Sequence, residues 1–348
     1  MKTVDLYTAD GWINIPAIRS FNCWLNVLIG PRQVGKTYGC LLDQLSMGNQ
    51  FVYMRRTEEE MSLVTSNEKL NPFLKMKQEG FSIDMVKMHK TYIIGDYETT
   101  SEGKHKITNT RGIGLALSSV SKIRGFDGSS FSDLVFDEFI PEKIVVQRRA
   151  EGDAFLNAYT TINGNRELKR VGAHPPLKVW LLANANNLDS PIITALRLSK
   201  DIEHVIRTGK EYLIKNGVFL AMPKSESVIE ERKETALMRH LRGSGEFYGM
   251  AIENKFSYDS LDMVRPKSIK GMKPLMSIGN MYIWDNGSSL YICGIPHRSR
   301  EMYGTAPEDS IRVGLIHPEL RMCYNFGYIS FDSSERMFEF KKFMNIKD

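Results

Sequence analysis

Apolar residues in the first 185 positions gather in short runs, and the segments between these runs have helical spacing. The runs lie at 24–30, 50–56, 112–118, 132–139 and 177–185, and 85–95 resembles a pair of short strands. Strands that are buried on both faces give runs of this kind, because neither face needs polar side chains. Residues 36–47 and 154–162 are spaced as helices, and Thr57 with Glu60 forms a capping box. The pattern predicts an α/β domain with a parallel sheet and helices on both faces.

The pattern changes after about residue 200. Residues 201–245 are charged and helix-like, and predict a linker or lid that follows a domain at 1–200. Residues 246–348 are dominated by strand signals and predict a smaller α+β domain. Asn286-Gly287, between alternating apolar runs, predicts a hairpin with a type I′ turn. The spacing of Asp332 and Glu335 predicts a helix cap near the C-terminus.

Composition narrows the class of protein further. The chain has 348 residues, of which 42% are hydrophobic and 25% charged, and its formal net charge is +5. This mild excess of bases is compatible with a polyanionic partner. The four cysteines include no Cys-x-x-Cys pair, which argues against a zinc site or a disulfide framework. No apolar run is long enough to span a bilayer, so we expect the protein to act in cytoplasm without a membrane partner.

Residues 30–37 read GPRQVGKT, which matches the phosphate-binding Walker A pattern Gly-x-x-x-x-Gly-Lys-Thr. Glycines let the backbone N–H groups point at phosphate oxygens, and the following helix adds its positive end. Lys36 is expected to reach the β and γ phosphates of ATP, and Thr37 to hold Mg²⁺. The nucleotide-binding residues predicted from the loop are Gly30, Pro31, Arg32, Gln33, Val34, Gly35, Lys36 and Thr37.

Two further strand ends carry polar side chains. LVFDE, residues 134–138, has the pattern of a Walker B strand, in which Asp137 holds the Mg²⁺ shell and Glu138 polarises the attacking water. Asn184, at the end of the 177–185 strand, is a candidate γ-phosphate sensor, although turn-forming asparagines are also common at strand ends. Glu138 favours a hydrolysing motor over a nucleotide-gated nucleic-acid-binding module, because hydrolysis needs a positioned base.

The chain contains one phosphate loop, and that loop supplies no arginine for the charge that develops on the γ phosphate. Lys122, Arg124 and Arg166 lie near the Walker B strand and are candidates to act on the site of a neighbouring subunit. Each of them is equally compatible with an exposed surface base. This arrangement favours a ring of identical chains. A helicase-like or protein-remodelling ring ATPase remains the alternative at this point.

These elements together resemble the DNA-packaging ATPases of small phi-twenty-nine-like tailed phages, which are related to large terminases. The resemblance rests on VLIGPRQVGKTYG, on QFVYMRRTEEE with its Arg55-Arg56 pair, on VFDEFI, and on NRE followed by LLANAN, all in this order. It covers most of the first 190 residues and only weakly the rest. It implies an additional-strand, RecA-like P-loop fold, a pentameric ring at the portal of a procapsid, and translocation of double-stranded DNA. Some relatives also bind a structural RNA.

Residue by residue, the resemblance carries the family's catalytic positions onto Lys36, Thr37, Asp137 and Glu138. Arg124 matches a base that acts across the subunit boundary. The chain departs from the pattern at Gly164, where relatives have the first arginine of an Arg-Asn-Arg-Glu string. If that arginine were the finger, its role would pass to Arg166, Lys122 or Arg124.

DNA contacts are expected in two basic segments. The first is SEGKHKITNTR, residues 101–111, with Lys104, Lys106 and Arg111 on a polar loop, which equally fits an exposed hairpin tip. The second is RPKSIKGMK, residues 265–273, with Arg265, Lys267, Lys270 and Lys273, which suits contact with nucleic acid or with the portal and equally fits a solvated loop. The resemblance to terminases also suggests an RNase H-like nuclease fold for the C-terminal domain. Its acids, such as Asp285 beside a turn, predict a degenerate domain rather than an active nuclease.

Overall fold

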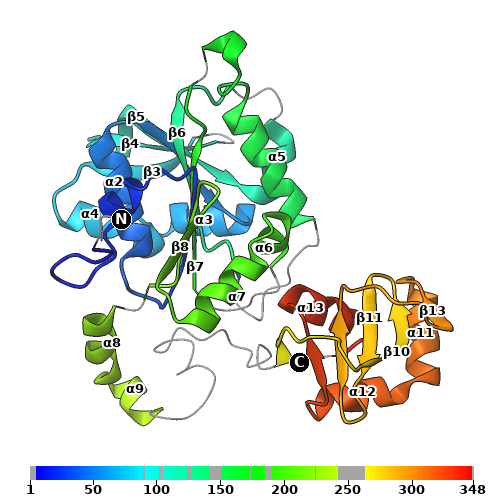
Figure 1. Ribbon diagram of the computed structural model, residues 1–348. Helices are drawn as coiled ribbons and strands as arrows, with labels where there is room; N and C mark the ends of the chain where they lie inside the picture. Colours follow the sequence, from blue (N-terminus) through cyan, green and yellow to red (C-terminus); the bar gives the residue numbers. More distant parts are fainter. Residues whose placement is uncertain are drawn as a thin grey trace. The chain divides into compact units, whose positions relative to one another are not determined.

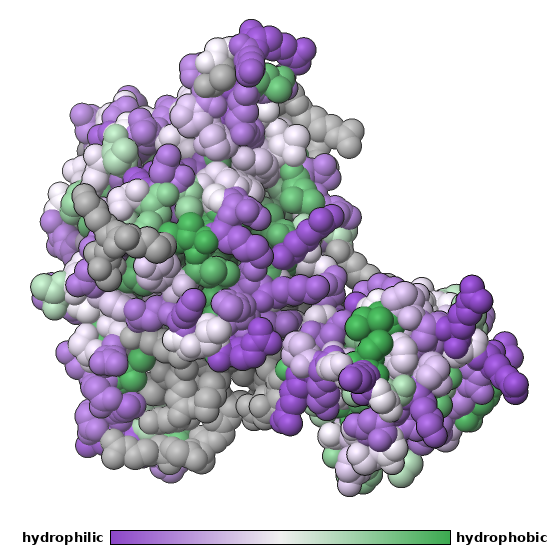
Figure 2. Space-filling model, in the orientation of Figure 1, coloured by the Kyte–Doolittle hydropathy of each residue, from purple (hydrophilic) through white to green (hydrophobic). Residues whose placement is uncertain are grey.

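The computed structural model describes residues 5–88, 91–101, 103, 105–123, 127–141, 150–172, 174–184, 190–223, 225–241 and 263–346. The chain divides into two compact units, each with its own sheet (Figure 1). The first unit comprises Met1–Leu196 with His204–Ser257, and the second Arg197–Glu203 with Tyr258–Asp348. No helix among the described residues is long and apolar enough to cross a membrane. On the face drawn in Figure 2, hydrophilic residues dominate and apolar ones form separate patches.

The first unit is built on a nine-stranded sheet. In spatial order its strands are β3 (Ile83–Met88), β4 (Thr91–Thr99), β5 (His105–Ala116), β2 (Gln50–Arg55), β6 (Phe131–Asp137), β7 (Lys178–Ala183), β1 (Leu25–Ile29), β9 (Val218–Ala221) and β8 (Tyr212–Lys215). The strands from β5 to β9 in this order run parallel. The outer strands β3, β4 and β8 pair antiparallel with their neighbours. The expected mixed α/β domain with a large parallel sheet is confirmed.

Helices lie on both faces of this sheet (Figure 1). They are α1 (Ile15–Arg19), α2 (Lys36–Met47), α3 (Glu58–Ser66), α4 (Leu74–Gln78), α5 (Glu151–Asn163) and α6 (Pro191–Ala195). α7 (Ser199–Thr208) belongs to the first unit only from His204 onward. Alternate residues of β6 show the two layers. Val135 belongs to the core under α1 to α4, whereas the ring of Phe136 stacks on Phe155 of α5 at 5.8 Å between centroids. Burial on both sides explains why this strand has an apolar run without alternation.

The sheet extends beyond the domain boundary that we expected at residue 200. β9 pairs in parallel with β1, and β8 completes the edge, so part of the expected linker is sheet. Only after these strands does the chain form α8 (Glu226–Lys233) and α9 (Ala236–His240). The two strands are four residues each, and strands this short leave a weak periodic signal among charged neighbours.

The second unit has a five-stranded sheet in the order β13 (Glu301–Tyr303), β10 (Lys273–Ile278), β11 (Met281–Asp285), β12 (Leu290–Cys293) and β14 (Ile329–Phe331). Its helices are α11 (Pro307–Ile316), α12 (Pro318–Asn325) and α13 (Ser334–Phe343). Residues such as Ile283 and Phe331 pack against these helices. On the opposite face, Trp284 and Tyr291 pack against Ile269 and Met272 of the segment before β10.

The predicted hairpin is present, but its turn is not type I′. β11 and β12 are joined by four residues, and Asp285 pairs with Leu290. Gly287 has a φ of 89°, whereas Asn286 is not in the left-handed region that a type I′ turn needs at both central positions. The Asn286 side-chain oxygen instead accepts from the backbone N–H groups of Ser288 and Ser289, at 2.9 and 2.8 Å. These two serines lengthen the loop and remove the need for the tighter turn.

Gly112 tests the close packing between β5 and β2. A Cβ atom there would lie 2.3 Å from the carbonyl oxygen of Phe51, so Gly112→Ala must displace backbone. We expect it to lower the free energy of unfolding by about 2 kcal/mol or more. The control is Gly314→Ala in α11, where a Cβ meets no atom within 4 Å. This change should stabilise its helix by about 0.5–1 kcal/mol. Urea unfolding of both variants measures the contrast, and equal midpoints would contradict it.

Candidate functional site

The phosphate loop, residues 30–37, joins β1 to α2. Gly35 has a φ of 83° and caps α2 without a side-chain hydrogen bond, so the first N–H groups of the helix carry no side-chain cap. Gln33 also has a positive φ, 62°. Uncapped N–H groups at a helix start, next to left-handed backbone, form a concave set of donors that suits phosphate oxygens. A Cβ at Gly30 would lie 2.9 Å from the Pro223 ring, so this position has no room for a side chain.

Lys36 lies inside the loop and is 7% exposed. Its ammonium donates to the carbonyl oxygens of Gly30 and Pro31 at 3.0 and 2.6 Å. It also reaches the side-chain oxygen of Asn184 at 3.4 Å, so the structure brings these two predicted residues together. Burial lowers the pKa of Lys36 to about 7, against the opposing effect of Asp137. A bound phosphate would supply the negative charge that this buried ammonium lacks.

Thr37 and Asp137 form the second part of the site. The Thr37 hydroxyl donates to one carboxylate oxygen of Asp137 at 2.8 Å. The other oxygen accepts from the Tyr53 hydroxyl at 3.0 Å, and burial raises the pKa of Tyr53 so that it stays a donor. A hydroxyl beside a fixed carboxylate is the oxygen donor set that Mg²⁺ prefers with a phosphate. The residues present therefore fit the expected metal.

Glu138 directly follows β6 and has a φ of 54°, which is unusual for a residue with a side chain. Its side chain is 56% exposed, whereas that of Asp137 is 9% exposed. Because of this positive φ, the two adjacent carboxylates point into different environments. Asp137 is held in the protein, and Glu138 faces the hollow lined by Lys36 and Thr37, which has a volume of about 310 Å³.

Arg55, at the end of β2, connects the two carboxylates, and we did not assign it to the site from the sequence. Its guanidinium contacts Asp137 at 3.1 Å and Glu138 at 2.7 Å, and its side chain is 12% exposed. The neighbouring Arg56 faces away and pairs with Glu151 of α5 at 2.7 Å. The Arg-Arg pair thus has one member at the site and one in the packing of α5. Strand alternation could have suggested this division, since successive side chains point to opposite faces.

Arg166 is held in place by hydrogen bonds to the backbone of its own chain. Its guanidinium donates to four backbone carbonyl oxygens, those of Gly128, Phe131, Ile162 and Asn163. Phe131 begins β6, about 20 Å along the strand from Asp137 at its other end. These contacts do not favour Arg166 as a base that reaches a neighbour's nucleotide.

The structure does not describe the side chains of the other two candidate bases. The side chain of Lys122 and all of Arg124 lie outside the described residues. Gly164 has φ 56° and ψ −140°, a conformation that strongly favours glycine. The local backbone therefore favours the glycine found here over an arginine.

The first basic segment is mostly strand rather than loop. β5 begins at His105, so Lys106 lies in the ladder opposite Glu98, and Arg111 pairs with Asp96 at 2.9 Å. Both bases thus have acids across the hairpin, which weakens their net attraction for DNA. Lys104 lies outside the described residues.

In the second segment, Arg265 joins the sheet through a backbone bond to Phe331. Lys267 donates to the Ser330 hydroxyl at 2.9 Å, and Lys267, Lys270 and Lys273 are all exposed. Asp285 accepts from the N–H of Gly287, and Asp332 pairs with Arg336 at 2.9 Å. Within the described ranges, no three His, Cys, Asp or Glu residues gather as a metal site.

Comparison with known proteins assigns the chain to a family. The family model of the podovirus DNA encapsidation protein (Gp16) matches residues 10–295. Among solved structures, the bacteriophage phi-29 viral genome packaging motor assembly matches 99% of this chain and 100% of its own, at 21% identity and a TM-score of 0.65. The phi-28 gp11 DNA packaging motor matches 98% and 100%, at 14% identity and a TM-score of 0.58. These likenesses concern the fold. No curated protein matches the sequence.

The ammonium of Lys36 offers a direct test of the site's electrostatics. Because burial disfavours the charged form, its ¹³Cε resonance should titrate with a midpoint near 7, far below the pKa of about 10.4 for a lysine in water. A bound anion stabilises the charged form, so tripolyphosphate should raise the midpoint, and anion affinity should fall as the pH rises above 7. Lys36→Arg identifies the resonance by removing it. A midpoint above 9 without anion would contradict the assignment.

Proposed function

This chain belongs to the podovirus DNA encapsidation protein (Gp16) family, and we propose that it hydrolyses ATP to drive double-stranded DNA into a preformed procapsid. The observation that carries the proposal is the meeting of Lys36, Thr37, Asp137 and Glu138 at one edge of a parallel sheet. Phosphate-binding, metal-binding and water-activating groups are thus within one hollow. The fold shared with two phage packaging motors supports DNA as the cargo.

We further infer the additional-strand, RecA-like class of P-loop fold. In this class a strand lies between the strand before the phosphate loop and the strand with the acidic pair. β7 lies between β1 and β6 and pairs in parallel with both. It also places Asn184, at its end, beside Lys36. This strand order supports the inferred role of Asn184 as a γ-phosphate sensor.

Each residue of the site has a role in this proposal. Lys36 binds the phosphate chain, and Thr37 and Asp137 would hold Mg²⁺. When bound, the metal ion supplies charge neutralisation at the phosphate oxygens. Glu138 accepts a proton from the attacking water, and its exposed side chain permits that access. Arg55 positions both carboxylates and prevents their mutual repulsion from separating them.

The proposed assembly is a pentameric ring of identical chains at the procapsid portal in the host cytoplasm, in which a structural RNA can take part. Hydrolysis at subunit boundaries would use a base from the neighbour, and Arg124 with Lys122 are the proposed bases. The C-terminal unit is proposed to be a degenerate RNase H-like domain. Its antiparallel meander β10-β11-β12 and the structural use of Asp285 and Asp332 support this reading. Lys270 and Lys273 are its proposed contacts with the DNA backbone.

Glu138→Gln tests the catalytic assignment. The amide cannot accept a proton, so ATP turnover should fall about 100-fold or more while ATP still binds. Packaging of genomic DNA by purified protein and procapsids should stop. Lys36→Ala, in contrast, should abolish tight ATP binding because the loop loses its buried cation. Turnover of Glu138→Gln within about twofold of the unmodified chain would refute the role of Glu138.

A second comparison separates a base that acts across the boundary from a structural one. Arg166→Ala should lower the free energy of unfolding by about 2 kcal/mol, because the hydrogen bonds from the guanidinium to four carbonyl oxygens are lost. Arg124→Ala should leave unfolding unchanged and lower ATPase activity. Mixing Arg124→Ala with Glu138→Gln chains should restore activity, since one boundary then combines an intact base with an intact acid. If no mixing ratio restores activity although both chains assemble, Arg124 does not act across the boundary.

A further inference from the structure

A set of buried polar side chains joins α2 to the sheet on the side away from the phosphate loop. The set consists of Arg19 at the end of α1, Asp43 and Gln44 in α2, Asp133 in β6 and Trp180 in β7. The side chains of Arg19, Asp43 and Asp133 are only 16%, 5% and 4% exposed. Charges this far from water need partners of opposite charge. These five residues form the Arg19 cluster.

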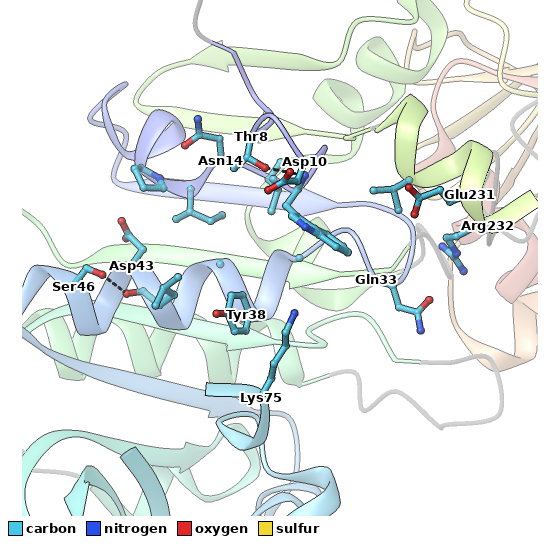
Figure 3. A pocket seen from close by; sticks show the side chains of 18 of the residues that line it. Thr8, Asp10, Asn14, Gln33, Tyr38, Asp43, Ser46, Lys75, Glu231 and Arg232 are labelled. Carbon is cyan, nitrogen blue, oxygen red and sulfur yellow. Dashed lines mark hydrogen bonds between the residues drawn. The ribbon is translucent and has the colours of Figure 1, made fainter. Parts of the chain in front are cut away.

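Arg19 connects two elements of the phosphate-binding unit. Its Nε donates to the Asp43 carboxylate at 2.7 Å, and a terminal nitrogen lies 2.9 Å from the Asp133 carboxylate. Asp43 projects from α2 toward the N-terminal segment, which carries α1 (Figure 3). Burial raises the pKa of Asp43, against the hydrogen bond from Arg19. A planar guanidinium has donors in fixed directions, so it sets the separation of the two carboxylates more closely than an ammonium group would.

Asp133 is held by further donors. The Gln44 side-chain amide and the Trp180 indole N–H donate to the same carboxylate oxygen, at 3.3 and 2.9 Å. The Ser132 hydroxyl donates to the other oxygen at 2.7 Å. The guanidinium carbon of Arg19 also lies 5.2 Å from the centre of the Trp180 ring. Groups from α1, α2 and β7 therefore meet at one carboxylate of β6.

The same helix and strand meet again at the nucleotide site, where the Thr37 hydroxyl donates to Asp137 at 2.8 Å. Asp133 and Asp137 lie on one face of β6, about 13 Å apart along the strand, because alternate residues share a face. Thr37 and Gln44 lie on one face of α2, about 10 Å apart, because they are separated by nearly two whole turns. α2 and β6 are thus joined at two points. Two points fix the tilt of a helix on a strand, whereas a single point leaves a hinge.

We propose that Arg19 is a positioning residue for ATP hydrolysis. By bridging Asp43 and Asp133, it keeps the Thr37 hydroxyl beside the Asp137 carboxylate, the pair proposed above to hold Mg²⁺. The inference rests on the proposed ATPase function. A contribution to stability alone is the competing explanation, and buried ion pairs often contribute little stability relative to apolar side chains. The two explanations differ in whether metal binding depends on Arg19.

Arg19→Lys tests the proposal, because a single ammonium keeps the charge but does not span both carboxylates. Mn²⁺ affinity, measured by electron paramagnetic resonance with a non-hydrolysable ATP analogue, should fall about tenfold, as it does when groups that orient metal ligands are changed. The Mg²⁺ concentration for half-maximal ATPase activity should rise by a similar factor. Metal-free affinity for tripolyphosphate should stay within about twofold, since the phosphate loop continues directly into α2.

Gln44→Met provides a second variant that removes no charge. It deletes the direct hydrogen bond between α2 and β6 and keeps a side chain of similar length. Mn²⁺ affinity should fall in the same direction by about threefold, because one uncharged hydrogen bond is lost. This variant decides the question if Arg19→Lys does not fold.

Lys77→Met is the matched control. Lys77 pairs with Asp84 of the outer strand β3 at 2.7 Å, and the two side chains are 10% and 8% exposed. Losing this buried pair should lower the urea midpoint of unfolding. Mn²⁺ affinity should stay within about twofold, because distant sites act independently.

The outcomes separate the two explanations. If Arg19→Lys and Gln44→Met leave Mn²⁺ affinity within twofold, the Arg19 cluster only stabilises the fold and the proposal is wrong. It is equally wrong if Lys77→Met weakens Mn²⁺ as much, or if metal-free tripolyphosphate affinity falls as far as Mn²⁺ affinity. If the unmodified chain neither hydrolyses ATP with Mg²⁺ nor binds Mn²⁺ with the ATP analogue, the ATPase function itself fails, and the role of Arg19 with it.

Discussion

Parallel pairing of β2, β6, β7 and β1 is the constraint on which the site depends. Because these neighbours run in one direction, their carboxyl ends meet at one edge of the sheet, where ligands of such sheets bind. Arg55 ends β2, Asp137 ends β6, Asn184 follows β7, and the phosphate loop follows β1. The register matters as much as the direction. A slip of β6 by one residue would exchange its two faces and turn Asp137 away from Thr37.

The charges at this edge are arranged in pairs that compensate one another. Asp137 and Glu138 are adjacent acids, and the guanidinium of Arg55 contacts both carboxylates. Removing Arg55 would leave a buried carboxylate with hydroxyl donors only, at a cost of several kcal/mol. Lys36 is different, because its partners are carbonyl and amide oxygens without full charge. The site thus holds its acids firmly and keeps its buried cation available to a phosphate.

The sequence predicts the central strands well, for physical reasons, and the structure brings the motif residues together in one hollow. Strands buried on both faces leave continuous apolar runs, and a phosphate loop needs glycines at fixed spacing. The sequence does not reveal roles that arise only when distant segments meet. Arg55 joins the site through the pairing of β2 with β6, and Arg166 is held by carbonyl oxygens more than thirty residues away, at Gly128 and Phe131. Short strands such as β8 and β9 are missed by the sequence pattern for another reason, since four residues are too few to show a period.

The extension of the sheet beyond residue 200 changes how the first unit is understood. β9 pairs with the strand that leads into the phosphate loop, and Ser225 and Arg232 bond to Gly11 and to the loop itself. Segments about 200 residues apart therefore surround the same loop. The segment 201–245, which the charge pattern presents as a linker, belongs from His204 onward to the first unit. The guanidinium of Arg232 in α8 donates a hydrogen bond directly to the carbonyl oxygen of Arg32 in the loop.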